Sequence, residues 1–274
     1  MAKLTLLLCL VALLGCSGES QPSPPPVTPT LATRASLPAT SGAPARSQLS
    51  TTVPMREPVA WDDPSNLLAN GSFEDGPGPW YAMLAPERPW WMDFDITDAA
   101  QHSGNYSVVF HLHARGTIPR GVRVWGVVRD LTPERFPRRL GGRYRVEDWN
   151  RGAEAQYVQV VIMAKVAPGH IPGLRVGLVQ VAYVLTGVDS RPLRISNRKF
   201  IFAGPKRPIE DEWIPFDFDL HADFQREWGA VPQQFEWIRV LFEARFDHYS
   251  SANKSELRGT VYYDDLYLGD GPTS

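Results

Sequence analysis

The chain has 274 residues, of which 43% are hydrophobic, and its formal net charge at pH 7 is −2 with histidine neutral. A charge balance so close to neutral provides no basic surface of the kind that nucleic-acid binders need, so no nucleic acid is expected as a partner. Both cysteines, Cys9 and Cys16, lie in the first sixteen residues, and the remainder of the chain has none with which to form a disulfide.

The first sixteen residues have the pattern of an export signal. Lys3 supplies the positive end, an apolar run follows from Leu4, and a small residue precedes Cys16; the run is too short to span a bilayer. The Leu-Leu-Gly-Cys sequence at residues 13–16 resembles the lipobox of bacterial lipoproteins. That resemblance implies that Cys16 becomes the acylated N-terminus and holds the protein at a membrane. The alternative is an ordinary signal peptide that contains a cysteine.

Residues 17–60 are expected to form a disordered linker. They are rich in Pro, Ser, Thr and Ala and contain no aromatic residue, so they cannot bury enough apolar surface to offset the loss of chain entropy. Ser17, directly after the cysteine, resembles the pattern that permits transfer to the outer membrane in Gram-negative cells. We therefore expect a protein of the bacterial cell envelope that is anchored by lipid and held off the membrane by a tether.

Residues 61–274 are expected to form one folded domain, because every Trp, Tyr and Phe lies at or after Trp61. Apolar residues recur with period two, for example at Val158, Val160 and Ile162, which is typical of half-buried strands. Strands are expected near residues 106–113, 122–130, 143–149, 157–164, 174–186, 194–202, 213–220, 237–246 and 258–268. At most a turn or two of helix is expected, near residues 223–228. The fold class predicted is therefore all-β, a two-sheet antiparallel sandwich of the jelly-roll type.

Three short motifs occur in order along this domain. Residues 66–76 read Asn-Leu-Leu-Ala-Asn-Gly-Ser-Phe-Glu-Asp-Gly, residues 102–107 read His-Ser-Gly-Asn-Tyr-Ser, and residues 261–268 read Val-Tyr-Tyr-Asp-Asp-Leu-Tyr-Leu. Together they resemble the galactose-binding-like jelly rolls, in particular the carbohydrate-binding modules that accompany bacterial polysaccharide-degrading enzymes. The resemblance implies a carbohydrate ligand. The domain is longer than such modules, and residues 168–212 look like an inserted hairpin and loop.

The same resemblance implies a structural calcium ion, held by Glu74, by Asp264 and by carbonyls near residues 103–105. Ca²⁺ takes six to eight oxygen ligands, several of them commonly backbone carbonyls. Strand alternation places Asp264 on the face of Leu266 and Leu268, and an acid on an apolar face needs a partner. The alternative is that Glu74 caps a turn and that Asp264 accepts backbone hydrogen bonds.

A ligand groove is predicted from aromatic and basic side chains, because sugar rings stack on indole while their hydroxyls take hydrogen bonds. If residues 106–130 form a hairpin, one polar face carries five of the candidates. These are His111, His113, Arg115, Arg123 and Trp125. Trp90 and Trp91 point to opposite faces of an extended segment, so at most one is expected to be a platform. The alternatives are a buried Trp125 and a solvated sheet face; His111 and His113 lack an evident third ligand for a transition metal.

Catalytic motifs such as Gly-x-Ser-x-Gly and His-Glu-x-x-His are absent from the sequence. Three classes of function remain. The first and preferred is a lipoprotein that binds carbohydrate, the second is a scaffold lipoprotein that binds another envelope protein, and the third, least favoured, is a glycoside hydrolase whose carboxylate pair forms only in three dimensions.

Overall fold

The computed structural model describes residues 58–174, 177–193, 195–252 and 256–271. Cys16 and nearly all of the expected linker lie outside the described residues. Within the described ranges, no helix is long and apolar enough to cross a membrane.

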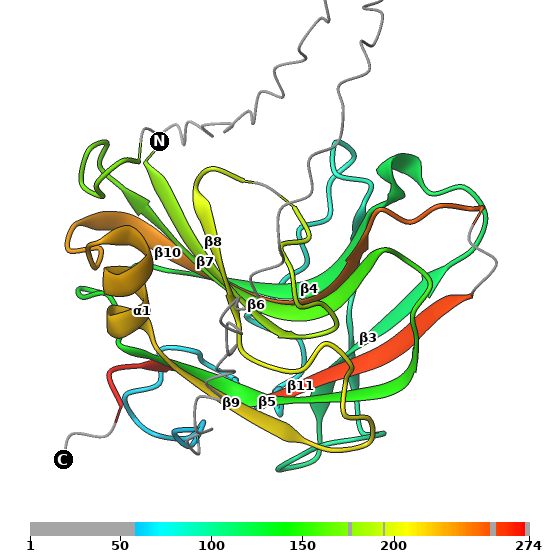
Figure 1. Ribbon diagram of the computed structural model, residues 1–274. Coiled ribbons are helices and arrows are strands. Elements are labelled where there is room, and N and C mark those ends of the chain that lie inside the picture. Colours follow the sequence, from blue (N-terminus) through cyan, green and yellow to red (C-terminus); the bar gives the residue numbers. More distant parts are fainter. Residues whose placement is uncertain (1–57, 175–176, 194, 253–255, 272–274) are drawn as a thin grey trace, which may run out of the picture. The chain divides into compact units, whose positions relative to one another are not determined.

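The described chain folds into two β-sheets packed face to face (Figure 1). Sheet A has six strands, in the spatial order β1 (Trp91–Met92), β4 (Arg123–Leu131), β10 (Phe235–Asp247), β6 (Ala155–Val166), β7 (Leu178–Thr186) and β8 (Arg198–Phe202). Sheet B has five, in the order β2 (Asp95–Thr97), β3 (Ser107–Ala114), β11 (Leu257–Gly269), β5 (Arg139–Asn150) and β9 (Ile214–Asp219). Among the strand pairs of the described residues, β1–β4 and β7–β8 are parallel and the others antiparallel. The predicted all-β jelly-roll sandwich is confirmed.

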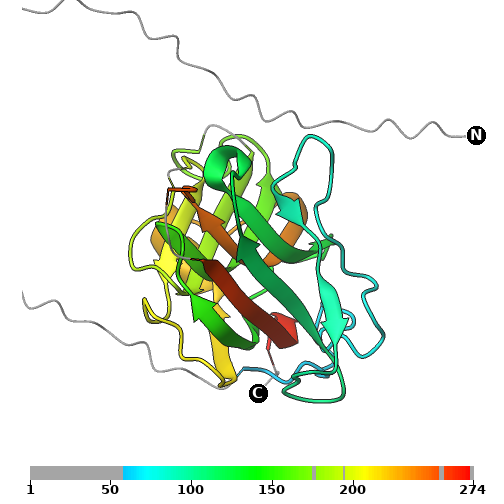
Figure 2. The same ribbon diagram turned by 90° about the vertical axis from the view of Figure 1, so that its right-hand side faces the viewer.

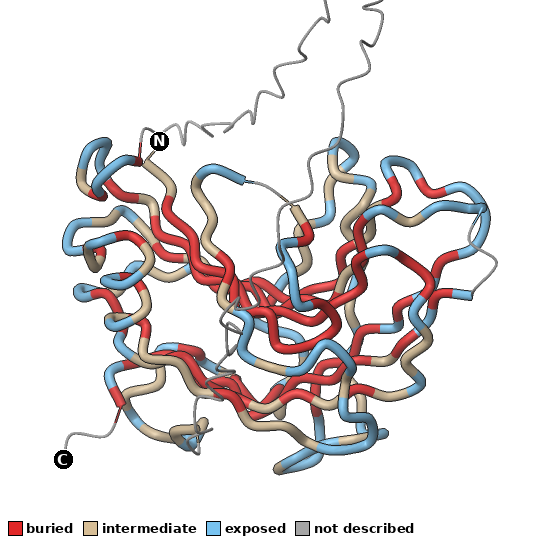
Figure 3. The backbone as a smooth tube through the Cα atoms, viewed as in Figure 1, coloured by how far each residue is buried: buried red, intermediate tan, exposed pale blue. Residues whose placement is uncertain are grey.

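The core lies between the two sheets, and strand alternation selects its residues. On β10, Ile238, Val240 and Phe242 face the core with no exposed surface, as their period-two spacing predicts. Aromatic rings from both sheets meet there, with the Phe242 and Tyr263 ring centroids 5.5 Å apart in an edge-to-face arrangement. Such a contact contributes about 0.5–1.5 kcal/mol beyond the burial of its area. Figure 3 shows that central strands such as β6, β7 and β11 are almost continuously buried, whereas β8 and β9 at the sheet edges are mostly of intermediate exposure.

One helix, α1 (Leu220–Trp228), closes an end of the sandwich and is longer than expected. Its N-cap is Asp219, whose side chain accepts a hydrogen bond from the backbone N–H of Ala222. Gly229 ends it with a left-handed φ of 74°. Leu220, Phe224 and Trp228 recur every four residues and are all buried, because this spacing places them on one helical face.

The hairpin expected over residues 106–130 does not form. β3 pairs with β2 and β11 in sheet B, whereas β4 pairs with β1 and β10 in sheet A. The connection between β3 and β4, which includes a 3₁₀ turn at Pro119–Gly121, therefore passes from one sheet to the other. Alternation along each strand was predicted well, but it does not specify which strand is the neighbour.

A second correction concerns β11. The pairing of β11 with β5 shifts between Asp264 and Tyr267, and Asp265 has a left-handed φ of 53°. This bulge adds a residue and changes the phase of alternation. Tyr263 faces the core before the bulge and Leu266 faces it afterwards, so, contrary to expectation, Asp264, which follows Tyr263, does not share the face of Leu266 and Leu268.

The segment expected to be an insertion, residues 168–212, contributes two strands of sheet A. β7 lies inside the sheet between β6 and β8, and β8 forms the sheet edge. The segment that precedes the first long strand, residues 58–97, runs along one side of the sandwich, where it is drawn in blue to cyan (Figure 2). These two parts of the chain supply the loops that shape the candidate site.

Candidate functional site

Sheet A is curved (Figure 1), and its outer surface, which faces away from sheet B, is here called the concave face. Strand register arranges its side chains in rows that cross the sheet from β4 to β8. The first row is Asp130, Arg239, Met163, Gln180 and Arg198; the second is Val128, Leu241, Val161, Ala182 and Phe200; the third is Gly126, Glu243, Gln159, Val184 and Phe202. The face therefore has an apolar middle row with polar or charged side chains in the rows on both sides.

Charged side chains are buried on this face. Arg245 donates to both carboxylate oxygens of Asp247, at 2.6 and 3.1 Å, and lies 3.8 Å from a Glu243 oxygen. The Tyr157 hydroxyl donates to Asp247 over 2.7 Å, and Gln159 Nε2 donates to Glu243 over 2.5 Å. The side chains of Arg245, Glu243 and Asp247 are only 12, 3 and 5% exposed. We call these five residues the buried ion network.

Burial by itself opposes the charged form of Arg245, but the negative charges of the network, including those of Asp247 and Glu243, raise the pKa of Arg245 well above its usual value. Gln159 Oε1 is buried and has no hydrogen-bond partner among the described residues. Such an orphaned acceptor costs free energy because water cannot reach it. The network is held in place, but it is not fully satisfied.

Two loops cover the concave face. In the 77–91 loop, Tyr81 forms a two-way backbone bridge with Val128, and the Trp91 ring packs close to Gly126. In the second loop, here called the 187–197 loop and described at residues 187–193 and 195–197, Val188 and Leu193 pack with the apolar side chains of the face. These covers explain why the outward residues of β6 and β10 are buried although the sheet faces away from the core.

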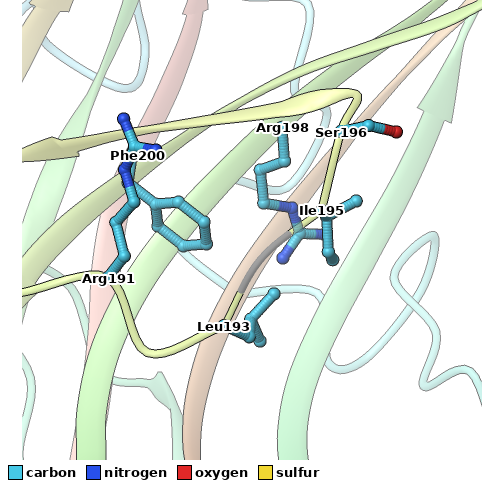
Figure 4. A pocket seen from close by; sticks show the side chains of 6 residues that line it. All are labelled: Arg191, Leu193, Ile195, Ser196, Arg198 and Phe200. Carbon is cyan, nitrogen blue, oxygen red and sulfur yellow. The ribbon is translucent and has the colours of Figure 1, made fainter. Parts of the chain in front are cut away.

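A pocket of about 620 Å³ opens between the 187–197 loop and β8. Its lining consists of Arg191, Leu193, Ile195, Ser196, Arg198 and Phe200 (Figure 4). Nε and Nη2 of Arg198 both donate to Gln180 Oε1, at 2.9 and 2.7 Å, and the Arg198 guanidinium lies 6.0 Å from the Phe200 ring centroid. Burial lowers the pKa of Arg198 below its usual value. The pocket therefore combines an aromatic ring, apolar side chains, a hydroxyl and two guanidinium groups.

A second polar group lies at the opposite edge of the face. Arg239 donates to both oxygens of Asp130, at 2.5 and 2.8 Å, and the Tyr81 hydroxyl donates to the same carboxylate over 2.6 Å. Burial and the Asp130 carboxylate raise the pKa of Tyr81 to about 12. The Arg239 guanidinium also lies 5.3 Å from the Trp237 ring centroid. This cluster fixes the edge of the face that lies away from the pocket.

The structure does not bring the five predicted hairpin residues onto one face. Trp125 is 3% exposed and packs in the core, with its ring centroid 6.0 Å from that of Phe246. The expectation of an exposed Trp125 platform is wrong, because β4 turns the side of the strand that bears Trp125 toward sheet B. The alternative of a buried tryptophan describes it correctly.

The other four residues lie around the exposed ends of β3 and β4. His111 and His113 are exposed on β3, Arg115 pairs with Glu256 at 2.8 Å, and Arg123 donates to the carbonyl of His113 over 3.2 Å. Among the described residues, no group of three or more potential metal-ligating side chains assembles around these histidines or elsewhere. None of these four residues lines the pocket beside β8.

The two adjacent tryptophans separate as strand geometry predicts. Trp90 lies 5.2 Å from the Arg120 guanidinium carbon and is half-buried. Trp91 packs against the apolar cluster of the concave face. Trp91 is thus the one predicted ligand residue that the structure places on the same face as the pocket.

Glu74 and Asp264 both hold the loop formed by residues 102–106. Glu74 accepts hydrogen bonds from the backbone N–H groups of Asn105 and Tyr106, each at 2.9 Å. Asp264 is fully buried and accepts from the backbone N–H groups of His102 and Ser103, at 2.7 and 3.2 Å. These contacts agree with the hydrogen-bonding alternative, whereas calcium binding stays a prediction. Burial and the neighbouring Asp265 carboxylate raise the pKa of Asp264 to about 7.

Sequence reasoning missed the pocket and the buried ion network. The alternation of Trp237, Arg239, Leu241, Glu243 and Arg245 did place them on one outward face. A signal was available in the opposite charges of Glu243, Arg245 and Asp247 at two-residue spacing, which is typical of an ion-paired strand face. Arg191 and Arg198 gave no comparable signal, because their convergence depends on how the 187–197 loop folds back.

Comparisons with known proteins give structural neighbours only. No protein-family model matches the sequence, and no curated protein matches it. One similar solved structure is the module TmCBM61 in complex with β-1,4-galactotriose, with 13% identity, 75% of this chain and 98% of that chain covered, and a TM-score of 0.38. Another is a carbohydrate-binding module specific for non-crystalline cellulose, CBM28, with 10% identity, 75% and 95% coverage, and a TM-score of 0.36. At these identities and scores, neither neighbour places a ligand on this chain.

Proposed function

We propose that this chain is a lipid-anchored protein of the bacterial cell envelope whose jelly-roll domain binds carbohydrate in the pocket beside β8. The observation that carries the proposal is the lining of that pocket. Phe200 and Leu193 supply apolar surface, while Arg191, Arg198 and Ser196 supply hydrogen-bond donors. A saccharide needs this combination, because its ring has apolar C–H faces and its rim has hydroxyls.

The dimensions and the support of the pocket agree with this proposal. Its volume of about 620 Å³ lies within the range of small-molecule sites, roughly 300–1,000 Å³. Arg198 and Phe200 stand on a strand, and the Gln180 amide orients Arg198. Groups fixed in this way lose little conformational entropy when a ligand binds.

A glycan array with the full-length chain, purified in detergent, tests the proposal. We expect binding to at least one class of polysaccharide, and we expect Ser196→Trp to abolish it, because an indole at this exposed position of the lining fills the pocket. Thr117→Trp, at an exposed position between β3 and β4, is the matched control and should bind like the unaltered chain. Binding that survives Ser196→Trp would move the ligand site elsewhere, and a protein partner captured without any glycan signal would support the scaffold function instead.

The membrane anchor gives a separate prediction. Acylation requires the thiol of Cys16, so Cys16→Ala should move the protein from the membrane fraction to the soluble fraction, or leave an unprocessed precursor. Membrane fractionation and intact mass measure both results. Cys9→Ala is the control and should fractionate normally; unchanged partitioning and mass in Cys16→Ala would refute the lipid anchor.

Calcium binding at the 102–106 loop would raise the thermal unfolding midpoint of the domain. If Glu74 and Asp264 share a Ca²⁺ ion, EDTA at pH 8, where a carboxyl group with a pKa of about 7 is mostly ionised, should lower the unfolding midpoint. A ligand at about 100 times its Kd contributes about 2.7 kcal/mol to the stability of the native state. Glu74→Gln should remove the response to calcium. An unchanged midpoint, with no metal found by elemental analysis, would leave both residues as acceptors of backbone hydrogen bonds.

A further inference from the structure

We propose that the pocket beside β8 selects an acidic sugar and recognises the carboxylate of a hexuronate residue. This inference rests on the carbohydrate binding proposed above and adds the charge of the ligand. Two of the six lining residues carry guanidinium groups, and none of the six is acidic. The side chains that line the pocket are therefore positively charged or neutral.

Two of the three guanidinium nitrogens of Arg198 are engaged in hydrogen bonds within the protein, and the third is available to a ligand. Nε and Nη2 both donate to Gln180 Oε1, whereas Nη1 has no hydrogen-bond partner among the described residues. The planar guanidinium is thus oriented before any ligand arrives. A carboxylate is the complementary acceptor, because its two oxygens match the parallel N–H donors of arginine.

Arg191 supplies a second cation. The residue is exposed, and within the described ranges it has neither a hydrogen bond nor an ion pair. In Figure 4 the Phe200 ring lies between the Arg191 and Arg198 side chains. Phe200 is 8% exposed, so a sugar ring in the pocket would meet the small accessible part of this ring, with a guanidinium on either side.

The nearby carboxylates do not neutralise these two arginines by direct pairing. Glu243 and Asp247 are engaged by Arg245, and they also accept hydrogen bonds from Gln159 and Tyr157. Arg198 is partly desolvated, which lowers its pKa. The charges of Glu243 and Asp247 oppose that shift from a distance, and an anionic ligand would add a direct partner for the guanidinium, which a neutral sugar does not.

The apolar part of the lining favours a sugar acid over a free inorganic anion. Leu193, Ile195 and Phe200 contribute a surface that a phosphate or sulfate ion cannot use, whereas the C–H face of a pyranose can pack on it. A hexuronate carries both features, since its carboxylate is attached directly to the pyranose ring.

The test compares oligogalacturonate with the same oligosaccharide after methyl esterification, because the two differ only in charge and one methyl group per residue. Binding to the full-length chain is measured by calorimetry at low and high salt, with an alginate oligosaccharide as a second uronate and a sulfated galactan as a different anion. The variants are Arg191→Gln and Arg198→Gln. Arg135→Gln is the control, since Arg135 is exposed, pairs with Asp270 and does not line the pocket.

We expect at least one of the two uronates to bind, and oligogalacturonate to bind more tightly than its ester. Each pocket variant should lose about ten-fold in affinity, the effect of one charge-assisted hydrogen bond, while Arg135→Gln should lose nothing. Added salt should weaken binding, because it screens exposed charges such as that of Arg191.

Other outcomes separate the two proposals. Tighter binding of the neutral ester, with both arginine variants unaffected, would overturn the acidic-sugar inference and leave carbohydrate binding standing. Binding of the sulfated galactan alone would overturn recognition of a carboxylate. Absence of binding to every glycan on the array would refute the proposed function itself. Arg191→Gln keeps the test valid if Arg198→Gln fails to fold, because Arg191 is exposed.

Discussion

Replacing Arg245 by methionine is expected to lower the free energy of unfolding by about 3–5 kcal/mol. The substitution keeps most of the aliphatic volume but leaves Asp247 and Glu243 buried without the guanidinium that pairs with them. Their side chains are only 5 and 3% exposed, so water cannot replace the guanidinium. Urea unfolding of the variant, followed by tryptophan fluorescence, measures the loss.

Two further variants distinguish loss of charge from loss of packing. Asp247→Asn, added to Arg245→Met, removes one of the two buried carboxylates that have lost their ion-pair partner, and should restore part of the stability. Arg135→Met, at an arginine whose side chain is 84% exposed, should change stability by less than about 1 kcal/mol. A loss below about 1 kcal/mol for Arg245→Met would mean that the buried ion network adapts to the substitution and does not depend on this cation.

Trp125→Ala is expected to destabilise the domain by about 3–5 kcal/mol, the usual cost of truncating a large buried side chain. Trp125 is 3% exposed, and its ring packs against that of Phe246, so the substitution opens a cavity between the sheets. Thermal and urea unfolding measure the effect. Trp90→Ala is the comparison and should cost less, because Trp90 is only half-buried.

The result for Trp125 also bears on where the ligand binds. In conditions where enough of the variant remains folded, its affinity for a glycan should be close to that of the unaltered chain, because Trp125 points away from the pocket side of sheet A. A well-folded Trp125→Ala with no glycan binding would restore the earlier prediction of a tryptophan platform and contradict the burial of this ring.

The sequence by itself determined where the strands lie and which residues share a face. Alternation on β10 separated Ile238, Val240 and Phe242 from Arg239 and Glu243, and the structure divides them in the same way. Such information is local, because successive side chains of any strand point to opposite sides. The helix was the exception, since only a turn or two was expected near residues 223–228, whereas α1 extends from Leu220 to Trp228 between the caps Asp219 and Gly229.

Only the tertiary structure decided which faces are buried and which residues meet. β3 and β4 are adjacent in the chain but belong to different sheets, and this reversed the expected exposure of Trp125. The bulge at Asp264 and Asp265 changed the phase of β11, and the 187–197 loop brought Arg191 to the same pocket as Arg198. Alternation along a strand predicts which residues share a face. Whether another sheet, a loop or water covers that face depends on segments that are distant in sequence.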